Sequence, residues 1–217
     1  MKQYGPMEAI RTGQLPLMWL ALAIIGGVSL FGIGYQVDFA KEVGFGPFIA
    51  ASSAGVLSIV NGVGRGFVGW LSDIIGRKES LVLVLVVEGV AQFGLLWAGD
   101  TRNEVLFIVF AFLAGLGGGA FFPLFAALTP DYFGENHNAT NYGLVYSSKL
   151  VSGLFGLGVA SYVVATWGYD GAYTIAGVIA FLSAFIALFL RQPGRRERER
   201  AGAGLGSAAL PAAGGPA

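Results

Sequence analysis

The sequence predicts an all-α membrane protein that crosses the bilayer six times. Of its 217 residues, 55% are hydrophobic and only 12% are charged, whereas soluble domains carry about 25% charged residues. The apolar residues fall into runs of about 20 residues, the length that a helix needs to span a bilayer. Short polar links separate these runs. We expect the six spans at residues 15–36, 46–71, 81–98, 104–128, 142–167 and 172–190.

Each predicted span is bounded by polar or charged residues. The links between successive spans are 37–45, the charged stretch at 73–80, 99–103, 129–141 and 168–171. Residues 1–14 form a polar N-terminal segment without the apolar core and cleavage site of a signal peptide. Residues 15–190 form the six-helix transmembrane domain. The tail, 191–217, is rich in Arg and Glu and then in Ala, Gly and Pro, a composition that predicts disorder.

Six crossings place both ends of the chain on the same side of the membrane. Lys and Arg in short links favour the cytoplasm. Nine of them lie on the side of the termini, against only Lys41 and Arg102 on the other side. We therefore expect a multi-pass protein of the cell membrane, inner or plasma, with both termini cytoplasmic. Trp97 and Trp167 then lie at the outer interface, where indole rings are enriched.

Two basic residues, Arg65 in the second span and Lys149 in the fifth, belong to no link. A charge at membrane depth costs at least about 2.5 kcal/mol and normally faces a bundle interior or an aqueous cavity. Measured from the predicted cytoplasmic ends of their spans, both lie about 9–11 Å deep at a helical rise of about 1.5 Å per residue. Two cations at one depth on different helices predict an anion bound between them.

Glu88, in the third span, offers a structural alternative. Its predicted depth is similar, so it could form an ion pair with Arg65 or Lys149 without any substrate. Such a pair would still leave the other cation unpaired, and ionisable groups inside membranes are functional by default. We therefore prefer the interpretation that the two cations form an anion-binding site.

Residues near the two cations favour a binding site. Because positions three and four apart on a helix share a face, Asn61 lines up with Arg65. Tyr142 and Tyr146 line up in the same way with Lys149. Asparagine amides and tyrosine hydroxyls can donate to carboxylate oxygens, and the rings would confine a small ligand. Ordinary packing or interface anchoring is the alternative explanation for the tyrosines.

The fourth span combines phenylalanines, a proline and a glycine run. Phe121, Phe122 and Phe125 flank Pro123. A proline frees a backbone carbonyl and can bend a helix, so this segment could shape a cavity wall, although core packing explains it equally well. Small residues let membrane helices approach closely, and we expect this role for Gly62, Gly64, Gly66, Gly115, Gly119, Gly153 and Gly156.

Other functions lack the residues that they need. The letters of a dinucleotide-binding fingerprint occur at 115–120, but inside an apolar run too long for a strand–turn–helix unit. The sequence has no GK[ST] triplet, no cysteine and a single histidine, His137, so it predicts no catalytic set, cofactor or metal site. The net charge of zero gives no indication of nucleic-acid binding. We expect a protein that is not an enzyme.

The charged stretch after the second span carries a specific motif. Gly69, Asp73, Gly76, Arg77 and Lys78 match all five key positions of G-x-x-x-D-x-x-G-R-K/R, and the stretch resembles the signature loop of the major facilitator superfamily. In that family the loop joins the second and third helices of each six-helix half. The resemblance implies one half of a twelve-helix transporter and a conformational-switch loop. It implies that Gly69 permits close helix approach, and that Asp73 and Arg77 form pairs or cap a helix end.

Two longer stretches, NGVGRGFVGWLSD and DYFGENHNATNYGLVYSSK, are similar to the C-terminal half of the oxalate/formate antiporter family, and IRTGQLPLMW is similar to the entry segment of that half. The resemblance covers about residues 8–190. It implies that Arg65 and Lys149 hold a small carboxylate and that Tyr146 belongs to an aromatic cage around it. The six N-terminal helices of that family, which supply the rest of the cage, have no counterpart in this sequence.

We therefore predict a secondary active transporter, or half of one, that exchanges small organic anions of the oxalate or formate type by alternating access. Its expected partners are the carboxylate, the lipid bilayer and a second six-helix half, which is either an N-terminal half or a second copy of this chain. The alternative is a six-helix fragment that does not transport, or a membrane assembly partner.

Overall fold

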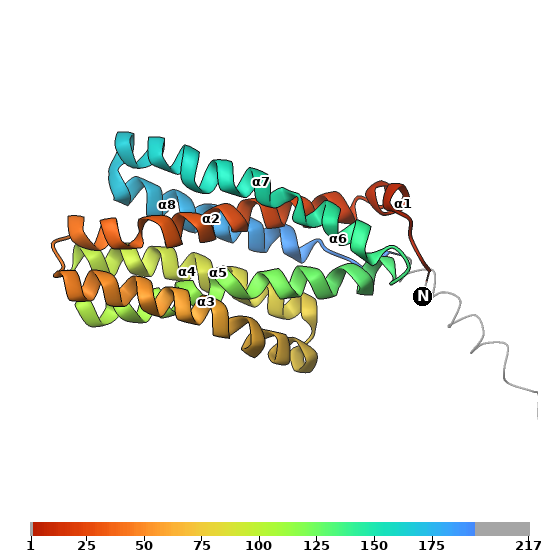
Figure 1. Ribbon diagram of the computed structural model, residues 1–217, viewed down its shortest axis with the longest axis horizontal. Helices are drawn as coiled ribbons and strands as arrows, with labels where there is room; N and C mark the ends of the chain where they lie inside the picture. Colours follow the sequence, from red (N-terminus) through yellow and green to blue (C-terminus); the bar gives the residue numbers. More distant parts are fainter. Residues whose placement is uncertain (1, 194–217) are drawn as a thin grey trace, which may run out of the picture.

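The computed structural model describes residues 2–193, which form a bundle of long helices running side by side (Figure 1). The helices are α1 (Pro6–Arg11), α2 (Gln14–Glu42), α3 (Pro47–Ile75), α4 (Arg77–Asp100), α5 (Glu104–Phe133), α6 (Asn138–Tyr146), α7 (Ser148–Gly153), the π-helix η1 (Leu154–Val159) and α8 (Ala160–Leu188). No strand occurs between residues 2 and 193.

The predicted all-α fold with six spans is confirmed. Helices α2 to α5 each form one long apolar crossing. The stretch Asn138–Leu188 is 51 residues long and makes two crossings, because the chain reverses inside α8 at Gly168 (Figure 1). Gly168 has φ 69° and ψ −175°, a conformation that a residue without a Cβ adopts without steric cost. Helices α6, α7 and η1 and the first residues of α8 form one crossing up to Gly168. The part of α8 after Gly168 runs back in the opposite direction.

Several helices extend beyond the apolar runs that predicted them. Helix α3 continues to Ile75 and α5 to Phe133, whereas the apolar runs end at residues 71 and 128. Gly76, with φ 102°, separates α3 from α4. At the other end of the bundle, the Asn103 side chain accepts a hydrogen bond of 3.0 Å from the Leu106 N–H and caps α5. Glycine and asparagine therefore set these helix ends, not the loss of hydrophobicity.

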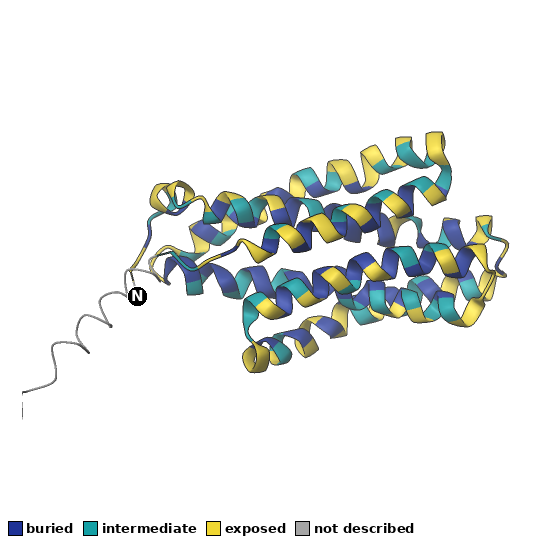
Figure 2. Ribbon diagram, turned by 180° about the vertical axis from the view of Figure 1, so that it is seen from behind, coloured by how far each residue is buried: buried dark blue, intermediate teal, exposed yellow. Residues whose placement is uncertain are grey.

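Helix α5 is the central element of the core. It packs against α3 on one side and α4 on the other, and α8 packs against α4. Large aromatic side chains fill the space between these helices, and the fully buried ones are Phe107, Phe121, Phe125, Phe133 and Tyr173. Helix α3 is the least covered span, because 28% of its most apolar window is buried against 61% for α2. Exposed residues accordingly run along the outer faces of the bundle (Figure 2).

Close helix approach was predicted for seven glycines, and the structure divides them into two groups. At four of them an added Cβ would meet a neighbouring helix: Gly64, Gly115, Gly119 and Gly156. At the other three, an added Cβ would find open space and no helix of this chain approaches closely: Gly62, Gly66 and Gly153. The rotation of each helix about its own axis decides whether a glycine faces a neighbouring helix or open space.

The N-terminal segment is fastened to the same end of the bundle as the α5–α6 link. The Tyr4 N–H donates to the Phe133 carbonyl at 2.8 Å, and the Asn141 amide donates to the Tyr4 carbonyl at 3.1 Å. At the same end, the Arg191 N–H, just after α8, donates to the Gln14 side chain at the start of α2 at 2.7 Å. The predicted tail lies outside the described residues from residue 194 onward.

Candidate functional site

The first predicted cation, Arg65, lies on α3 one turn after Asn61. Its Nη2 donates to the Asn61 Oδ1 at 3.1 Å, so the two residues share a helix face, as predicted. Asn61 is buried and Arg65 is exposed. The Arg65 Cζ lies 5.5 Å from the centroid of the Phe122 ring on α5, within the range of a cation–π interaction.

The second predicted cation, Lys149, lies on α7 and contacts the same ring. Its Nζ lies 5.0 Å from the Phe122 centroid and 5.3 Å from the Tyr146 centroid. The Nζ also donates to the Tyr146 hydroxyl at 3.1 Å. The Tyr142 ring lies 5.6 Å from the Tyr146 ring. Lys149, Tyr146 and Tyr142 therefore form one cluster next to Phe122.

Phe122 is the residue that joins the two cations. Because both cations lie over the same ring, the distance between the Arg65 Cζ and the Lys149 Nζ cannot exceed the sum of their distances to its centroid. The sequence identified Phe122 only as one of three possible cavity-wall phenylalanines. The other two, Phe121 and Phe125, are fully buried in the core. The site thus combines side chains of the second, fourth and fifth spans.

Neither cation has a counterion among the described residues. The ion pairs in this part of the chain are Lys41 with Asp38 and Arg77 with Asp131. The structural alternative, an ion pair of Arg65 or Lys149 with Glu88, is wrong, because Glu88 is buried and accepts a hydrogen bond from Gln92 instead.

The two cations lie at similar distances from the helix ends on one side of the bundle. Arg65 is ten residues from the end of α3 at Ile75, and Lys149 is eleven residues from the start of α6 at Asn138. At about 1.5 Å per residue, both lie about 15–17 Å from these helix ends. Because α3 continues past its apolar run through the exposed Asp73, this distance is longer than the depth in the hydrocarbon. The depth of about 9–11 Å, counted from the apolar runs, therefore stays a prediction.

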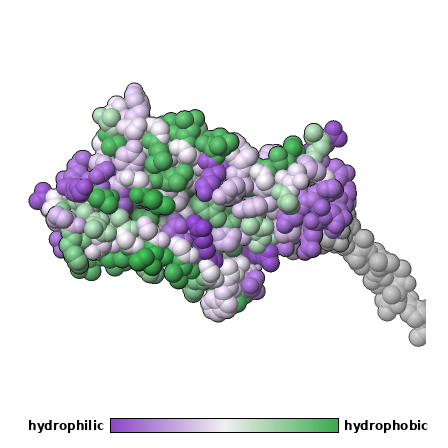
Figure 3. Space-filling view, viewed as in Figure 1, coloured by the Kyte–Doolittle hydropathy of each residue, from purple (hydrophilic) through white to green (hydrophobic). Residues whose placement is uncertain are grey.

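The site lies on an open face of the bundle. Arg65 and Lys149 are exposed, Tyr146 is 39% exposed, and Tyr142 is half-buried. Figure 3 shows hydrophilic groups in the middle of a face whose surroundings are largely apolar. Within this chain, the arrangement is one wall of a binding site and not an enclosed cavity.

The predicted switch loop connects α3 and α4 to neighbouring helices. The Arg77 Nε lies 3.3 Å from the Asp131 Oδ2, and its Nη1 donates to the Ala127 carbonyl at 3.0 Å. The Lys78 Nζ donates to the Leu188 carbonyl at 2.7 Å. Arg77 therefore both pairs with α5 and binds a backbone carbonyl of its last turns.

Two other members of the loop behave differently from the prediction. Asp73 makes no hydrogen bond or ion pair with any residue in the described part of the chain, so it is not the partner of Arg77. An added Cβ at Gly69 would meet open space. The expected close approach of a helix at Gly69 therefore does not occur within this chain.

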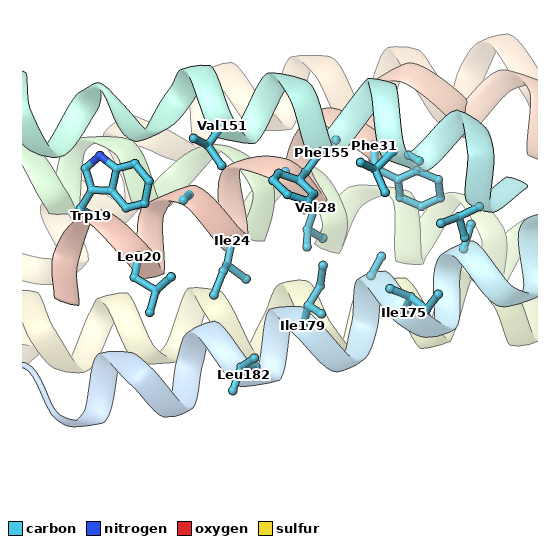
Figure 4. A pocket seen from close by; sticks show the side chains of 18 residues that line it. Trp19, Leu20, Ile24, Val28, Phe31, Val151, Phe155, Ile175, Ile179 and Leu182 are labelled. Atoms are coloured by element: carbon cyan, nitrogen blue, oxygen red, sulfur yellow. The ribbon is translucent and has the colours of Figure 1, made fainter. Parts of the chain in front are cut away.

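A large apolar groove lies elsewhere, between α2, η1 and α8 (Figure 4). Its volume is about 390 Å³, and its lining includes Ile24, Phe155 and Ile179. It contains none of the residues predicted to bind an anion and no charged side chain. A small anion would lose its hydration there without a compensating donor, so the groove is not the anion site.

The bundle of long apolar helices, with two cations that lack counterions among the described residues, is typical of a polytopic membrane protein of the transporter class. Residues 17–215 match the model of the Major Facilitator Superfamily. The chain belongs to this family. This is a family of transporters and not of enzymes.

The chain is similar to several transporters of small anions. It is 25% identical to the oxalate:formate antiporter of Oxalobacter formigenes, over 87% of this chain and 45% of that protein. It is 28% identical to monocarboxylate transporter 12-B of Danio rerio, over 77% of this chain and 35% of that protein. It is 22% identical to inorganic phosphate transporter 1-1 of Arabidopsis thaliana, over 87% of this chain and 42% of that protein. The chain thus spans less than half the length of these relatives.

Proposed function

We propose that Arg65 and Lys149 bind a small carboxylate, and that the chain supplies the anion-binding half of a transporter that exchanges such anions. One observation carries the proposal. Two cations from different spans, without counterions among the described residues, lie over the same ring, Phe122. Unpaired charges inside a membrane are costly, and a bound anion would offset that cost.

The chemistry of the donors fits a carboxylate. A guanidinium presents paired N–H donors that match carboxylate oxygens, and an ammonium acts as a compact point charge. Tyr146, Tyr142 and Asn61 add neutral donors next to these cations. The names of the similar proteins include oxalate, formate and monocarboxylates, but also inorganic phosphate. Oxalate and formate are therefore the first substrates to test, with phosphate as the competing class.

The open face next to the site fits a second six-helix half. On α3, added Cβ atoms at Gly62, Gly66 and Gly69 would meet open space, and Phe67 and Trp70 are exposed. A second bundle packed there would bury these side chains and close the site. The partner is an N-terminal half or a second copy of this chain, and both termini of this half lie in the cytoplasm.

The free-energy cost of closing the transporter over an empty site favours exchange of anions over uncoupled passage. When the two halves close over Arg65 and Lys149 without an anion, two unpaired cations are buried, which is strongly unfavourable. A bound carboxylate neutralises the site and permits closure. During the cycle, the contacts of Arg77 with Asp131 and Ala127 would break and re-form as the halves rock.

The test is thermal unfolding of the purified chain with oxalate, formate, phosphate or chloride at matched ionic strength. A ligand that binds the folded state raises the melting temperature with its concentration. We expect oxalate or formate to do so, and R65Q and K149Q to abolish the effect. Lys41→Gln, which removes an exposed lysine far along the chain from the site, is the matched control and should retain it.

Two results would overturn the proposal. Stabilisation that persists in both R65Q and K149Q would place the anion elsewhere. Absence of any anion effect, both alone and after co-expression with a six-helix partner, would favour the alternative of a fragment or assembly partner that does not transport.

A further inference from the structure

A glycine segment of α5 separates the anion site from a buried acid. An added Cβ at Gly119 would meet Asn61, the hydrogen-bond partner of Arg65. An added Cβ at Gly117, two residues earlier, would meet the backbone and carboxylate of Glu88 on α4. Only residues without side chains allow α5 to lie so close to both helices. The acid and the anion site are therefore separated by the thickness of one helix backbone.

Glu88 is unusual among the carboxyl groups of the described residues. It is 1% exposed, whereas the other Asp and Glu side chains in residues 2–193 are exposed or half-exposed. Its Oε1 accepts a hydrogen bond of 2.8 Å from the Gln92 amide. Its Oε2 is also buried but has no hydrogen-bond partner, and the Oε1 of Gln92 lacks one as well.

No cation of the described residues compensates Glu88. On α2, Ser29 faces the same part of α5, since its hydroxyl donates to the Gly118 carbonyl at 2.7 Å. An added Cβ at Gly118 would contact both the Ser29 Oγ and the Glu88 Oε2. On α8, the titratable group facing this region is Tyr173, whose hydroxyl donates to Gln36. Helix α5 contributes only glycines, and the ion pairs lie elsewhere.

This geometry favours the protonated form of the Glu88 carboxyl group. A charged carboxylate would place an uncompensated charge in the core, and its Oε2 would have no donor. A proton on Oε2 removes the charge and turns an acceptor without a partner into a donor, close to the hydroxyl of Ser29.

We propose that Glu88 is a proton-binding site whose occupancy is coupled, across the glycine segment of α5, to anion binding at Arg65 and Lys149. The coupling half of this inference rests on the proposed function, whereas the proton site does not. The cations favour release of the proton through their charge, and a bound anion cancels that charge. Anion binding should therefore promote uptake of a proton by Glu88.

Infrared spectroscopy tests the proton site without any ligand. At pH 7, the wild-type chain should show the C=O stretch of a protonated carboxylic acid, and this band should disappear in Glu88→Gln. Glu104→Gln, which removes an exposed carboxyl from the start of α5, is the matched control and should keep the band. If Glu88→Gln does not fold, Glu88→Asp should shift the band instead. The absence of an acid band from the wild type, or its persistence in Glu88→Gln, would overturn the proton site.

Calorimetry tests the coupling. At the pH where the infrared band has lost half its intensity, oxalate binding is measured in buffers with different ionisation enthalpies. The wild type should take up a fraction of a proton per anion, and Glu88→Gln should bind oxalate without proton uptake. Equal uptake in both proteins, or none in either, would overturn the coupling. If the wild type binds no anion at all, the proposed function fails, and the infrared result alone decides whether Glu88 holds a proton.

Discussion

The contact between α3 and α5 predicts that alanine destabilises the chain at one glycine and stabilises it at another. An alanine Cβ at Gly119 would run into the backbone carbonyl and the side chain of Asn61. Because a backbone group cannot move aside, the two helices must separate, and such overpacking costs about 1–3 kcal/mol. Alanine has a better helix propensity than glycine, which stabilises the folded state by about 0.8–1 kcal/mol. We therefore expect a net loss of roughly 0–2 kcal/mol for Gly119→Ala.

Gly66→Ala is the matched control on the partner helix. An added Cβ there meets open space, so only the gain in helix propensity of about 0.8–1 kcal/mol remains. For a chain of this size, 1 kcal/mol shifts the melting temperature by about 2–4 °C. Thermal unfolding in detergent should show a decrease of up to about 8 °C for Gly119→Ala and an increase of about 2–4 °C for Gly66→Ala.

The same pair of variants reports on the anion site. Gly119→Ala should also weaken oxalate binding, because it displaces Asn61 and with it the guanidinium of Arg65. Gly66→Ala should leave binding by the isolated chain unchanged. If Gly119→Ala raised the melting temperature as much as Gly66→Ala does, α3 and α5 could not be in the contact described, and both proposals would lose their common structural basis.

Two further predictions concern the ring between the cations and the switch loop. Phe122→Leu removes two cation–π contacts of about 0.5–1 kcal/mol each and should weaken oxalate binding several-fold in calorimetry, whereas Phe112→Leu, at an exposed position of the same helix, should not. Arg77→Gln loses the half-exposed ion pair with Asp131 and the bond to the Ala127 carbonyl, and should destabilise the chain by about 1–2 kcal/mol. Asp131→Asn loses only the first contact and should cost less in the same unfolding assay; equal costs would contradict the assigned carbonyl bond.

The number and order of the spans could be predicted from the sequence because hydrophobicity is a local property. Runs of about 20 apolar residues separated by charged links leave little choice. The cations Arg65 and Lys149 could be identified equally well, because a charged residue inside an apolar run is easily recognised in a sequence. The helix ends were less visible, because α3 and α5 continue into polar residues until Gly76 and Gly134 stop them.

The faces of the helices could not be predicted in the same way. Helix α5 is apolar on all sides, so its sequence does not show how it is rotated about its axis. Phe121, Phe122 and Phe125 therefore looked alike, although only Phe122 lies beneath the two cations. Glu88 was assigned a partner by depth alone, but it faces away from the cations, on the other side of α5. Depth follows from counting residues, whereas direction depends on packing.

The rotation of α5 also explains why one helix lies next to the anion-binding candidates, to Glu88 and to the switch loop. Gly117 lies against the acid and Gly119 against the anion site, while Phe122 lies beneath both cations. One to three turns later, Ala127 and Asp131 hold the arginine of the switch loop. A packed helix moves as a rigid element, so a displacement of α5 that opens the loop must also change its distance to Glu88 and to Asn61. If the two proposals hold, proton, anion and loop contacts are coupled through the position of α5.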